Sequence, residues 1–331
     1  MIYRILIVGL GSIGCKHLEI ARDLFPEADI RLLRSKNNSC PKEANGVFIL
    51  LQEAINFCPD IVVIANPASQ HINIANSFAE SGAHLLIEKP LSDKSSDIQP
   101  LLEIYEQKNK VLMVGYNLKF LNSLREFKSL LSANIIGKVL SVHCDVGQYL
   151  PSWRPDSDYK TTVSANKELG GGVLLELSHE IDYLRWIFGE ISWVKATLTK
   201  LSSFEIDVED TAFLTLGNNN DSLIISLNLD FLRHDKTRQC IAIGEKGTLR
   251  WNGITGVVDI FLEGSKKWEI LFSSDLISDN SYVKEWNHFI ECIEKNIKPI
   301  NSGYDGLKVL EIIEAAKISS DLNSKVFLEH I

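Results

Sequence analysis

A segment led by three glycines carries ionisable side chains at a regular spacing. Residues 170–182 read GGGVLLELSHEID, and Glu176, His179 and Asp182 follow one another at steps of three. Side chains three apart on an α-helix lie one turn from each other and can touch. A histidine beside carboxylates is suited to general acid–base catalysis. The segment alone fits two interpretations: a buried helix with polar positions, or a glycine-hinged helix that presents acid–base groups to a substrate.

A second group suited to proton transfer is Lys89, which follows the apolar run AHLLI in the motif EKP. A lysine amine that is partly withdrawn from water can donate or accept a proton. Lys89 and His179 are therefore the two candidates for catalysis, with a surface lysine at a strand end and a structural histidine on a helix as the alternatives. Four further side chains are predicted to contact the substrate or assist catalysis: Tyr116, Arg154, Glu176 and Asp182.

The N-terminal segment has the pattern of a dinucleotide-binding loop. An apolar run, IYRILIV, leads into GLGSIG, and an amphipathic stretch, CKHLEIARDLF, follows. In this strand–turn–helix order Gly9 permits the tight turn, Gly11 lets the backbone approach a pyrophosphate, and Gly14 lets helix and strand pack closely. Ser12 and Ile13 open the helix whose N-terminus attracts the anion.

The end of the second strand bears on the choice of cofactor. NAD-binding proteins carry an acidic residue about 20 positions beyond the glycines, where it holds the ribose hydroxyls. This chain has Arg34 and Ser35 there, after DIRLL. An arginine can pair with the 2′-phosphate of NADP, and a hydroxyl can donate to it. We therefore favour NADP over NAD, with a solvated arginine that has no cofactor role as the alternative.

Strands and helices alternate through the first third of the chain. Strands are expected at 29–35, 60–67, 83–90 and 111–117, with a helix at 70–82. This alternation predicts a doubly wound parallel sheet, whose ligands lie at the carboxyl ends of the strands. Besides the glycine loop, those ends carry polar or turn-forming residues that are expected to line one cofactor cleft: Asn66, Pro67, Glu88, Lys89, Tyr116 and Asn117.

From about residue 119 the pattern changes. Runs such as TAFLTLG, SLIISLNLDF and QCIAIGEKGTLRW follow one another, and consecutive strands without intervening helices predict an antiparallel sheet. The expected fold is α/β: a Rossmann dinucleotide-binding domain at 1–118, then a substrate-binding and oligomerisation domain at 119–331 with an open, mostly antiparallel sheet. One face of that sheet would pack on helices, and the other would form a homodimer or homotetramer interface.

Two segments of this second region are candidates for the site. The loop YLPSWRPDSDYK contains Trp153 and Arg154, and arginine suits bidentate binding of phosphate or carboxylate; an ordinary exposed loop is the alternative. A helix is expected at 173–188, because five apolar side chains form one arc at 100° per residue: Leu174, Leu177, Ile181, Leu184 and Phe188. His179 lies away from that arc, on a side where a cleft is expected.

Composition excludes several classes of protein. The 331 residues include 34 Lys and Arg against 43 Asp and Glu, a net charge of −9. An acidic chain without a basic block is a poor partner for nucleic acid. No apolar run reaches the ~20 residues of a membrane span. Six scattered cysteines without a C-x-x-C pair indicate reduced thiols and no metal site. The N-terminus has no basic leader, so we expect a cytoplasmic protein.

Six motifs in the same order are similar to those of the glucose–fructose oxidoreductase, inositol dehydrogenase and rhizopine catabolism (Gfo/Idh/MocA) family. They are GLGSIG, NPASQH, EKP, VGYNLKF, GGGVLLELSHEID and GEKGTL, and the tail SGYDGLKVLEIIEAA resembles the family's last helix. The similarity covers essentially the whole chain. The block from YLPSWRP through the glycine run resembles members that act in surface-glycan or nonulosonic-acid sugar synthesis.

The resemblance implies an NAD(P)-dependent oxidoreductase that transfers a hydride between nicotinamide and the hydroxyl or keto carbon of a sugar, cyclitol or nucleotide sugar. It implies that Lys89 lies near the nicotinamide, with Glu88 and Pro90 fixing the turn. Asn66 and His71 match the family's loop beside the nicotinamide ring. Trp153 and Arg154 match a loop that reaches back over cofactor and substrate.

In one respect the sequence departs from the family. The family commonly has an aspartate four residues before the histidine, but here that position is Leu175, and Glu176 stands three before His179. The resemblance therefore supports a role for His179 in catalysis or substrate binding. It does not support one for Glu176, whose candidacy depends only on its being a carboxylate near His179.

Two other functions stay open. Some members of the family use bound NAD transiently during elimination or glycoside cleavage, without net oxidation. A sensor or assembly partner that only binds the cofactor is the second alternative. The presence of both Lys89 and His179 argues against a sensor, which has no need of paired acid–base groups.

Overall fold

The computed structural model describes residues 3–35, 40–154, 157–219, 222–275 and 279–330. The chain forms two compact units, Met1–Tyr116 with Tyr282–Leu310, and Asn117–Ser281 with Glu311–Ile331. The first change of unit falls close to the boundary expected at residue 118. The return of the chain to the first unit after residue 281 is not part of the expected organisation, because amphipathicity alone does not tell which sheet a helix packs on.

A six-stranded parallel sheet lies at the centre of the first unit, in the order β3-β2-β1-β4-β5-β6. The predicted doubly wound parallel sheet is thereby confirmed. The inner strands are apolar along their length because both faces of the sheet are covered. The strands are β1 Arg4–Val8, β2 Asp29–Leu33, β3 Gly46–Phe48, β4 Ile61–Ile64, β5 His84–Glu88 and β6 Leu112–Gly115.

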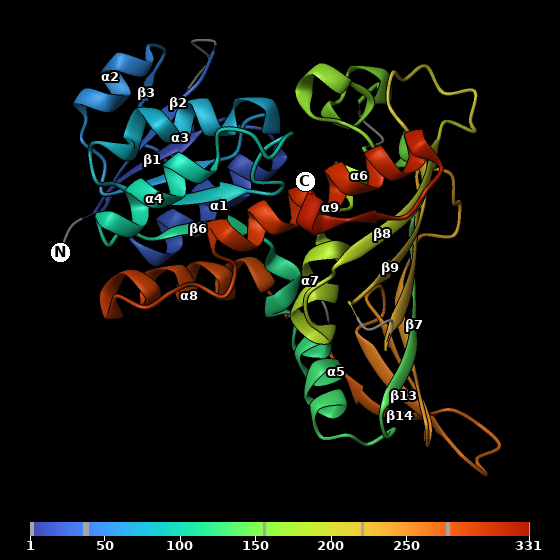
Figure 1. The fold of residues 1–331 in the computed structure, drawn as a ribbon. Coiled ribbons are helices and arrows are strands. Elements are labelled where there is room, and N and C mark those ends of the chain that lie inside the picture. Colours follow the sequence, from blue (N-terminus) through green and yellow to red (C-terminus); the bar gives the residue numbers. More distant parts are fainter. Residues whose placement is uncertain (1–2, 36–39, 155–156, 220–221, 276–278, 331) are drawn as a thin grey trace. The chain divides into compact units, whose positions relative to one another are not determined.

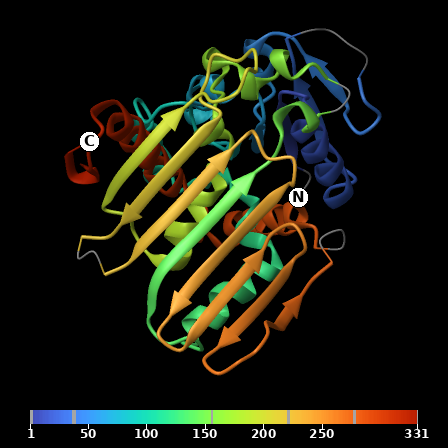
Figure 2. The ribbon, with the colours of Figure 1, turned by 90° about the vertical axis from the view of Figure 1, so that its right-hand side faces the viewer.

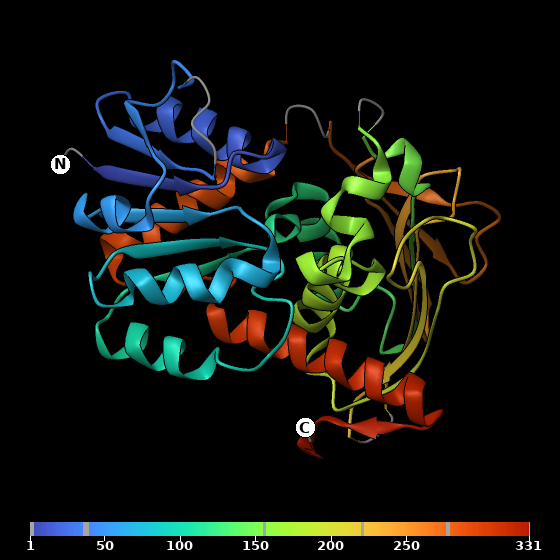
Figure 3. The ribbon, with the colours of Figure 1, turned by 90° about the horizontal axis from the view of Figure 1, so that it is seen from above.

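Helices cover both faces of this sheet (Figure 3). The helices of this unit are α1 Ser12–Leu24, α2 Leu51–Asn56, α3 His71–Ala79, α4 Gln99–Gln107 and α8 Ser281–Lys295. Leu18 and Ala21 of α1 share one buried core with Trp286 and Phe289 of α8. The apolar side of α8 therefore packs on the Rossmann sheet together with α1. The last helix, α9 Gly303–Leu322, begins in this unit and continues into the other.

The second unit contains a nine-stranded sheet in the order β14-β13-β12-β11-β7-β10-β9-β8-β15. Its neighbouring strands are antiparallel except β7 and β10, which run parallel. The predicted open, mostly antiparallel sheet is confirmed. The strands are β7 Val139–Gly147, β8 Trp193–Thr199, β9 Thr211–Gly217, β10 Ile224–Asp230, β11 Thr237–Gly244, β12 Gly247–Asn252, β13 Val257–Leu262, β14 Glu269–Ser273 and β15 Val326–Phe327.

The two faces of this sheet differ. Helix α5, Asn122–Ser132, and the helices after the glycine run lie on one side (Figure 1), and among the described residues no helix covers the other face (Figure 2). In β9 the buried Ala212 and Leu214 point to the covered face, whereas Phe213 between them is 51% exposed. The alternation of buried and exposed side chains along β9 is that of a sheet with one open face.

The single helix expected at 173–188 is broken in two. α6, Val173–Glu176, ends where the main chain leaves helical geometry, and α7, His179–Phe188, begins after two intervening residues. The leucines and Ile181 of the predicted apolar arc are nevertheless buried, whereas Phe188 is half-buried. Because the turn is interrupted, the three-residue step from Glu176 to His179 does not fix how their side chains face each other.

Short 3-10 helices recur in the segment between β7 and α6. They are η3 Leu150–Ser152, η4 Tyr159–Thr161, η5 Val163–Ala165 and η6 Lys167–Leu169. Three others lie elsewhere in the chain: η1 Ala68–Gln70, η2 Asn117–Phe120 and η7 Leu328–His330. No helix in the described ranges has the length and apolar character needed to cross a membrane.

A half-buried histidine at the start of β5 makes the stability of the first unit sensitive to pH. Nδ1 of His84 accepts the Val111 N–H at 3.1 Å, and Lys110 Nζ lies 3.5 Å from Nε2. Burial, reinforced by the Lys110 charge, lowers the pKa of His84 from 6.5 to about 4. Between these two values the unfolded chain binds a proton that the native protein does not.

We therefore expect the free energy of unfolding to fall as the pH drops from about 6.5 to about 4. The variant His84→Gln should show a shallower fall over this range, because glutamine does not titrate. Urea unfolding of both proteins at several pH values checks this. Equal slopes for the two proteins would contradict it.

Candidate active site

The glycine loop has the geometry that a dinucleotide needs. Gly9 has φ +87°, and a Cβ there would lie 2.8 Å from the Ala65 carbonyl oxygen. A Cβ at Gly14 would lie 2.3 Å from the carbonyl oxygen of Gly9. At Gly11, by contrast, nothing described lies within 4 Å of the Cβ position. The two crowded positions require glycine, and the space at Gly11 is open for a pyrophosphate.

The N-terminus of α1, next to this loop, has no described side chain that caps its main-chain N–H groups. Gly11 is the N-cap residue, and neither a capping side chain nor an acidic residue occupies the first turn in the described chain. Ser12 is exposed and Ile13 half-buried. The positive end of the helix dipole therefore has no competing carboxylate within its own first turn, which favours an anionic ligand.

Two loops at the carboxyl ends of β4 and β5 are tied together by His71. Its Nε2 lies 2.8 Å from the Asn66 carbonyl oxygen and its Nδ1 lies 3.0 Å from that of Pro90. Burial lowers the pKa of His71, so the ring is neutral at pH 7 and donates to one of these oxygens at a time. His71 thus holds the loop of Asn66 and Pro67 against the turn after Lys89.

Asn66 also offers an acceptor for a ligand. Its Nδ2 donates to Gln70 Oε1 at 3.1 Å, while its Oδ1 is shielded from water and has no hydrogen-bond partner among the described residues. A polar atom left in this state is costly unless a ligand or water satisfies it. Together with the open space at Gly11, Asn66 Oδ1 fits a cofactor lying along this rim.

Glu88 stabilises the turn that carries Lys89. The Glu88 side chain is 6% exposed, and its Oε2 accepts the Lys89 N–H at 3.1 Å. Its Oε1 lies 2.8 Å from Nε2 of the buried His17. Both carboxylate oxygens are therefore engaged within the protein, which favours a positioning role for Glu88. Lys89 itself is half-buried at the end of β5.

Arg34 and Ser35 follow β2 directly, at its carboxyl end, as the sequence predicts. Arg34 is half-buried, its main-chain N–H donates to Phe48 O at 3.1 Å, and Ser35 is exposed. Because the strands are parallel, this strand end and the glycine loop lie on the same edge of the sheet. Neither position carries a carboxylate.

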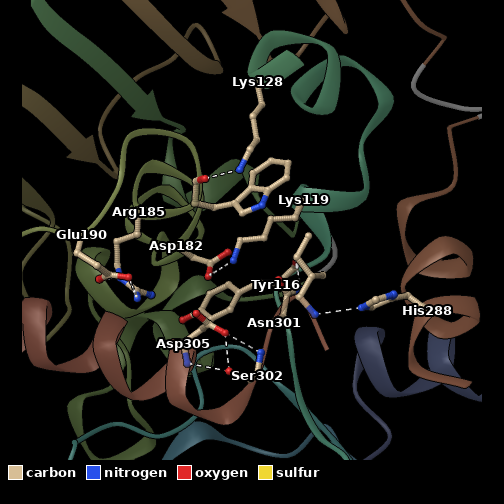
Figure 4. Close-up of polar contacts among 12 residues, drawn as sticks. Tyr116, Lys119, Lys128, Asp182, Arg185, Glu190, His288, Asn301, Ser302 and Asp305 are labelled. Carbon is tan, nitrogen blue, oxygen red and sulfur yellow. Dashed lines mark hydrogen bonds and ion pairs between the residues drawn. The ribbon is translucent and has the colours of Figure 1, made fainter. Parts of the chain in front are cut away.

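Tyr116 and Asn117 follow β6 and are buried rather than exposed on the rim. The Tyr116 carbonyl oxygen accepts Asn301 Nδ2 at 2.9 Å (Figure 4), and the Tyr116 side chain is fully buried. Asn117 donates through Nδ2 to Ser281 Oγ at 2.8 Å. These contacts favour structural roles for both residues.

In the second unit each glycine of the run that opens α6 meets a specific constraint. Gly170 has φ +83° at the end of η6, and Gly172 has φ +107°. A Cβ at Gly171 would lie 2.3 Å from Val163 O, and one at Gly172 would lie 2.5 Å from Glu209 Oε1. The glycines therefore allow close packing and strained backbone, and do not form a loose hinge.

Glu209 fixes the start of α6. Its Oε1 accepts the Leu174 N–H at 3.1 Å and its carbonyl oxygen accepts the Val173 N–H. Burial raises the pKa of Glu209. A carboxylate at a helix N-terminus satisfies main-chain N–H groups that would otherwise lack partners. Glu209 thereby positions the short helix that ends at Glu176.

His179 begins α7 and is half-buried, as is Glu176 at the end of α6. The first turn of α7 is held by two ion pairs whose carboxylates are buried. Glu180 Oε1 lies 2.8 Å from Arg238 Nε. Asp182 Oδ1 lies 2.8 Å from Lys119 Nζ (Figure 4), and both side chains are at most 3% exposed. This pairing favours a positioning role for Asp182 over contact with a substrate.

The loop of Trp153 is anchored within its own unit. Its indole N–H donates to Gln148 O at 3.0 Å, and its ring meets Phe231 edge to face with centroids 5.1 Å apart. Arg154, the next residue, is exposed. The loop therefore has a fixed base from which an exposed guanidinium extends.

Sequence reasoning missed four residues that shape these segments: His17, Lys119, Glu209 and Trp286. Only the position of His17 could have been recognised from the local sequence. His17 lies three residues after Gly14, so on a helix it shares the face that packs on the sheet. The other three act through partners distant in sequence, which no local pattern reveals. Among the described residues, no group of three or more His, Cys, Asp or Glu side chains is placed to hold a metal ion.

Comparison with known proteins agrees with this geometry. The myo-inositol 2-dehydrogenase of Thermotoga maritima is 26% identical over 345 aligned positions, which cover 99% of each chain. Levoglucosan dehydrogenase in complex with NADH has the same fold, with a TM-score of 0.86 at 20% identity and 99% coverage of each chain. The WlbA dehydrogenase of Bordetella pertussis, solved with NADH and UDP-GlcNAcA, also shares the fold, with a TM-score of 0.80 at 20% identity and 99% coverage of each chain.

Domain-level matches extend over nearly the whole sequence. Residues 3–116 match the NAD-binding Rossmann fold of an oxidoreductase family, and residues 128–328 match the C-terminal alpha/beta domain of the same family. The first match contains the glycine loop, the Asn66 loop and the Lys89 turn, and the second contains α6, α7 and the nine-stranded sheet. The chain therefore belongs to the Gfo/Idh/MocA oxidoreductase family.

Proposed function

We propose that this protein is a dehydrogenase or reductase that uses a nicotinamide dinucleotide and acts on the hydroxyl or keto carbon of a sugar, cyclitol or nucleotide sugar. The observation that carries the proposal is the glycine loop, where open space at Gly11 meets an uncapped α1. The dehydrogenases similar to this chain act on inositol and levoglucosan, and a third was solved with a nucleotide sugar. These relatives support a polyhydroxylated ring as the substrate.

The cofactor, when bound, supplies a hydride acceptor or donor. The residues that would hold it are those of the rim: Gly9, Gly11, Asn66 and the turn of Lys89. Lys89 and His179 would share the proton of the substrate hydroxyl, one group holding it while the other orients the oxygen. That Lys89 and His179 both contact the same substrate is likewise proposed. General acid–base assistance of this kind contributes about 10²–10⁴-fold to a rate.

Turnover tests this function directly. Purified protein is mixed with each reduced and oxidised nicotinamide dinucleotide and with a panel of inositols, free sugars, anhydrosugars and nucleotide sugars. Loss or gain of reduced-nicotinamide absorbance with at least one class supports the proposal. Conversion of a sugar with no net change in nicotinamide would instead support elimination or glycoside cleavage. Tight cofactor binding with no chemistry on any class would support a sensor.

For the cofactor, we propose NADP over NAD. The support is Arg34, followed by the exposed Ser35 at the carboxyl end of β2, with no carboxylate at either position. An ion pair with the 2′-phosphate would be lost in Arg34→Ala, so the Kd for NADPH should rise about 10- to 100-fold, the effect of a hydrogen bond to a charged group. The Kd for NADH should stay within a few-fold. Titration by nucleotide fluorescence measures both, and equal changes would contradict the preference.

We also propose that the open face of the nine-stranded sheet joins copies of this chain into a homodimer or homotetramer. Phe213 is exposed on that face, and Asp145 there accepts hydrogen bonds from Asn228 at 2.8 Å and Gln239 at 3.4 Å. A broad sheet face with an ordered polar row and an exposed aromatic ring suits a self-complementary interface. Light scattering should give a multimer mass, and Phe213→Asp should reduce it; a monomer mass for the unaltered protein contradicts the proposal.

A further inference from the structure

A chain of buried hydrogen bonds in the first unit connects α8 to the turn of Lys89. Trp286 Nε1 donates to His17 Nδ1 at 2.9 Å, and His17 Nε2 lies 2.8 Å from Glu88 Oε1. Glu88 Oε2 in turn accepts the Lys89 N–H at 3.1 Å. Trp286 and His17 are fully buried, and Glu88 nearly so. Three elements distant in sequence thus meet behind the rim of the sheet.

The donors and acceptors in this chain fix the tautomer of His17. An indole N–H can only donate, so Nδ1 of His17 must accept. A neutral imidazole then carries its one proton on Nε2 and donates it to the Glu88 carboxylate. The other neutral tautomer, with its proton on Nδ1, would place two N–H groups against each other at Trp286.

Glu88 has little freedom to move away from these partners. A Cβ at Gly115 on the neighbouring strand β6 would lie 3.1 Å from Glu88 Cδ and from Oε1. The carboxylate therefore lies between the strand on one side and His17 on the other. Because its second oxygen accepts the Lys89 N–H, a shift of the carboxylate must also shift the main chain at Lys89.

We infer that His17 and Trp286 are positioning residues that set, through Glu88, the main-chain position of Lys89. The inference rests on the proposed function, in which Lys89 transfers a proton. A misplacement of about 1 Å in a catalytic group can cost about 10²-fold in rate. Loss of His17 should therefore act mainly on kcat, because Lys89 would still be present but misplaced.

The first test reads the tautomer without any substrate. Nitrogen-15 NMR of the full chain, with histidine labelled and His17 assigned from the His17→Gln spectrum, should show Nε2 protonated and Nδ1 unprotonated. The result should be the same with and without the nicotinamide dinucleotide. A proton on Nδ1 would overturn the inference.

The second test compares two replacements of His17. Glutamine offers an NH2 donor group and a carbonyl acceptor on a planar amide, so it can serve both Glu88 and Trp286. Leucine can serve neither. His17→Leu should lower kcat about 10- to 100-fold with a change of only a few-fold in the KM for the cofactor, and His17→Gln should recover most of the loss. Equal losses in both variants, or none in either, would overturn the inference.

Trp286→Phe keeps an aromatic ring in the core and removes only the N–H, so it keeps the inference testable if His17→Leu fails to fold. It should lower kcat by several-fold and leave the His17 tautomer mixed. An unchanged kcat with an unchanged tautomer would overturn the inference. The matched control is Tyr105→Phe on α4, whose hydroxyl is buried in the same unit and has no hydrogen-bond partner among the described residues. It should leave kcat unchanged.

The outcomes separate this inference from the proposed function. If the unaltered protein transfers no hydride with any substrate class, the proposed function fails, and the kinetic role of His17 fails with it, whereas the tautomer result still stands or falls by NMR. If the unaltered protein is active and His17→Leu keeps its kcat, only the positioning inference fails.

Discussion

Replacing Lys89 with methionine should lower kcat/KM by about 10²–10⁴-fold and leave cofactor affinity nearly unchanged, because general acid–base assistance is worth about that much. Methionine keeps the apolar stem of the side chain and removes only the ammonium. Lys89 directly follows β5, on the same sheet edge as the glycine loop. Glu88 accepts its main-chain N–H, and His71 lies against the carbonyl oxygen of the next residue, Pro90. The main chain of this turn is therefore expected to survive the substitution.

Steady-state kinetics with the best substrate and fluorescence titration of the cofactor measure the two effects separately. The matched control is Lys94→Met, which removes an exposed lysine from the loop that follows the same strand. It should leave both quantities unchanged. A Lys89→Met protein with full kcat/KM would rule out a catalytic role for this lysine. A loss confined to cofactor affinity would make Lys89 a binding residue only.

The parts of this protein that could be predicted from sequence are those set by short-range rules. The glycine loop is an example: three glycines at fixed spacing between a strand and a helix have few other uses, and each has the crowding or openness expected of it. The parallel sheet was predictable because strands alternate with helices in the first third of the chain. The antiparallel sheet was predictable because consecutive strands later in the chain have no helices between them. In each case the signal lies within a few residues of the feature.

The features that could not be predicted depend on partners far away in sequence. The α6–α7 break is one: the apolar arc is continuous at helical spacing, yet the helix is interrupted. The N-terminal end of α6 is set by Glu209, which lies beyond β8, 35 positions after Leu174. Placing side chains at 100° per residue assumes an unbroken helix. With the helix interrupted, the three-residue spacing of Glu176 and His179 does not establish that their side chains touch. The return of α8 to the first unit is another, since its partner is the Rossmann core.

The ion pair of Lys119 and Asp182 illustrates how the same limitation affects the site. At the sequence level Asp182 is a carboxylate one turn from His179 and a reasonable candidate for contact with a substrate. In the structure it is buried and its charge is neutralised by a lysine of η2, 63 positions away. A charge this deeply buried must be paired, so its partner determines its role.

Removing one member of that pair should therefore be among the most destabilising single changes in the second unit. Lys119→Met leaves the Asp182 carboxylate buried without its cation and should lower the free energy of unfolding by about 3–5 kcal/mol. The double variant Lys119→Met/Asp182→Leu removes both charges and should recover most of the loss, because a buried ion pair can often be replaced by apolar side chains at little net cost. Urea unfolding of the single and double variants measures the difference.

The neighbouring pair of Arg185, on α7, and Glu190, just beyond that helix, provides the control. Both Glu190 oxygens accept from Arg185 (Figure 4), and the Glu190 side chain is 68% exposed. Glutamine keeps a carbonyl oxygen that can accept from the buried Arg185 guanidinium, and Glu190 itself is well solvated, so Glu190→Gln should cost about 1 kcal/mol. If Lys119→Met costs no more than Glu190→Gln, Asp182 tolerates the loss of its cation and a role in contact with a substrate regains support. If the single variant is costly and the double variant recovers, Asp182 is held in place by Lys119 to position α7, and His179 at the start of that helix is the group left to act on the substrate.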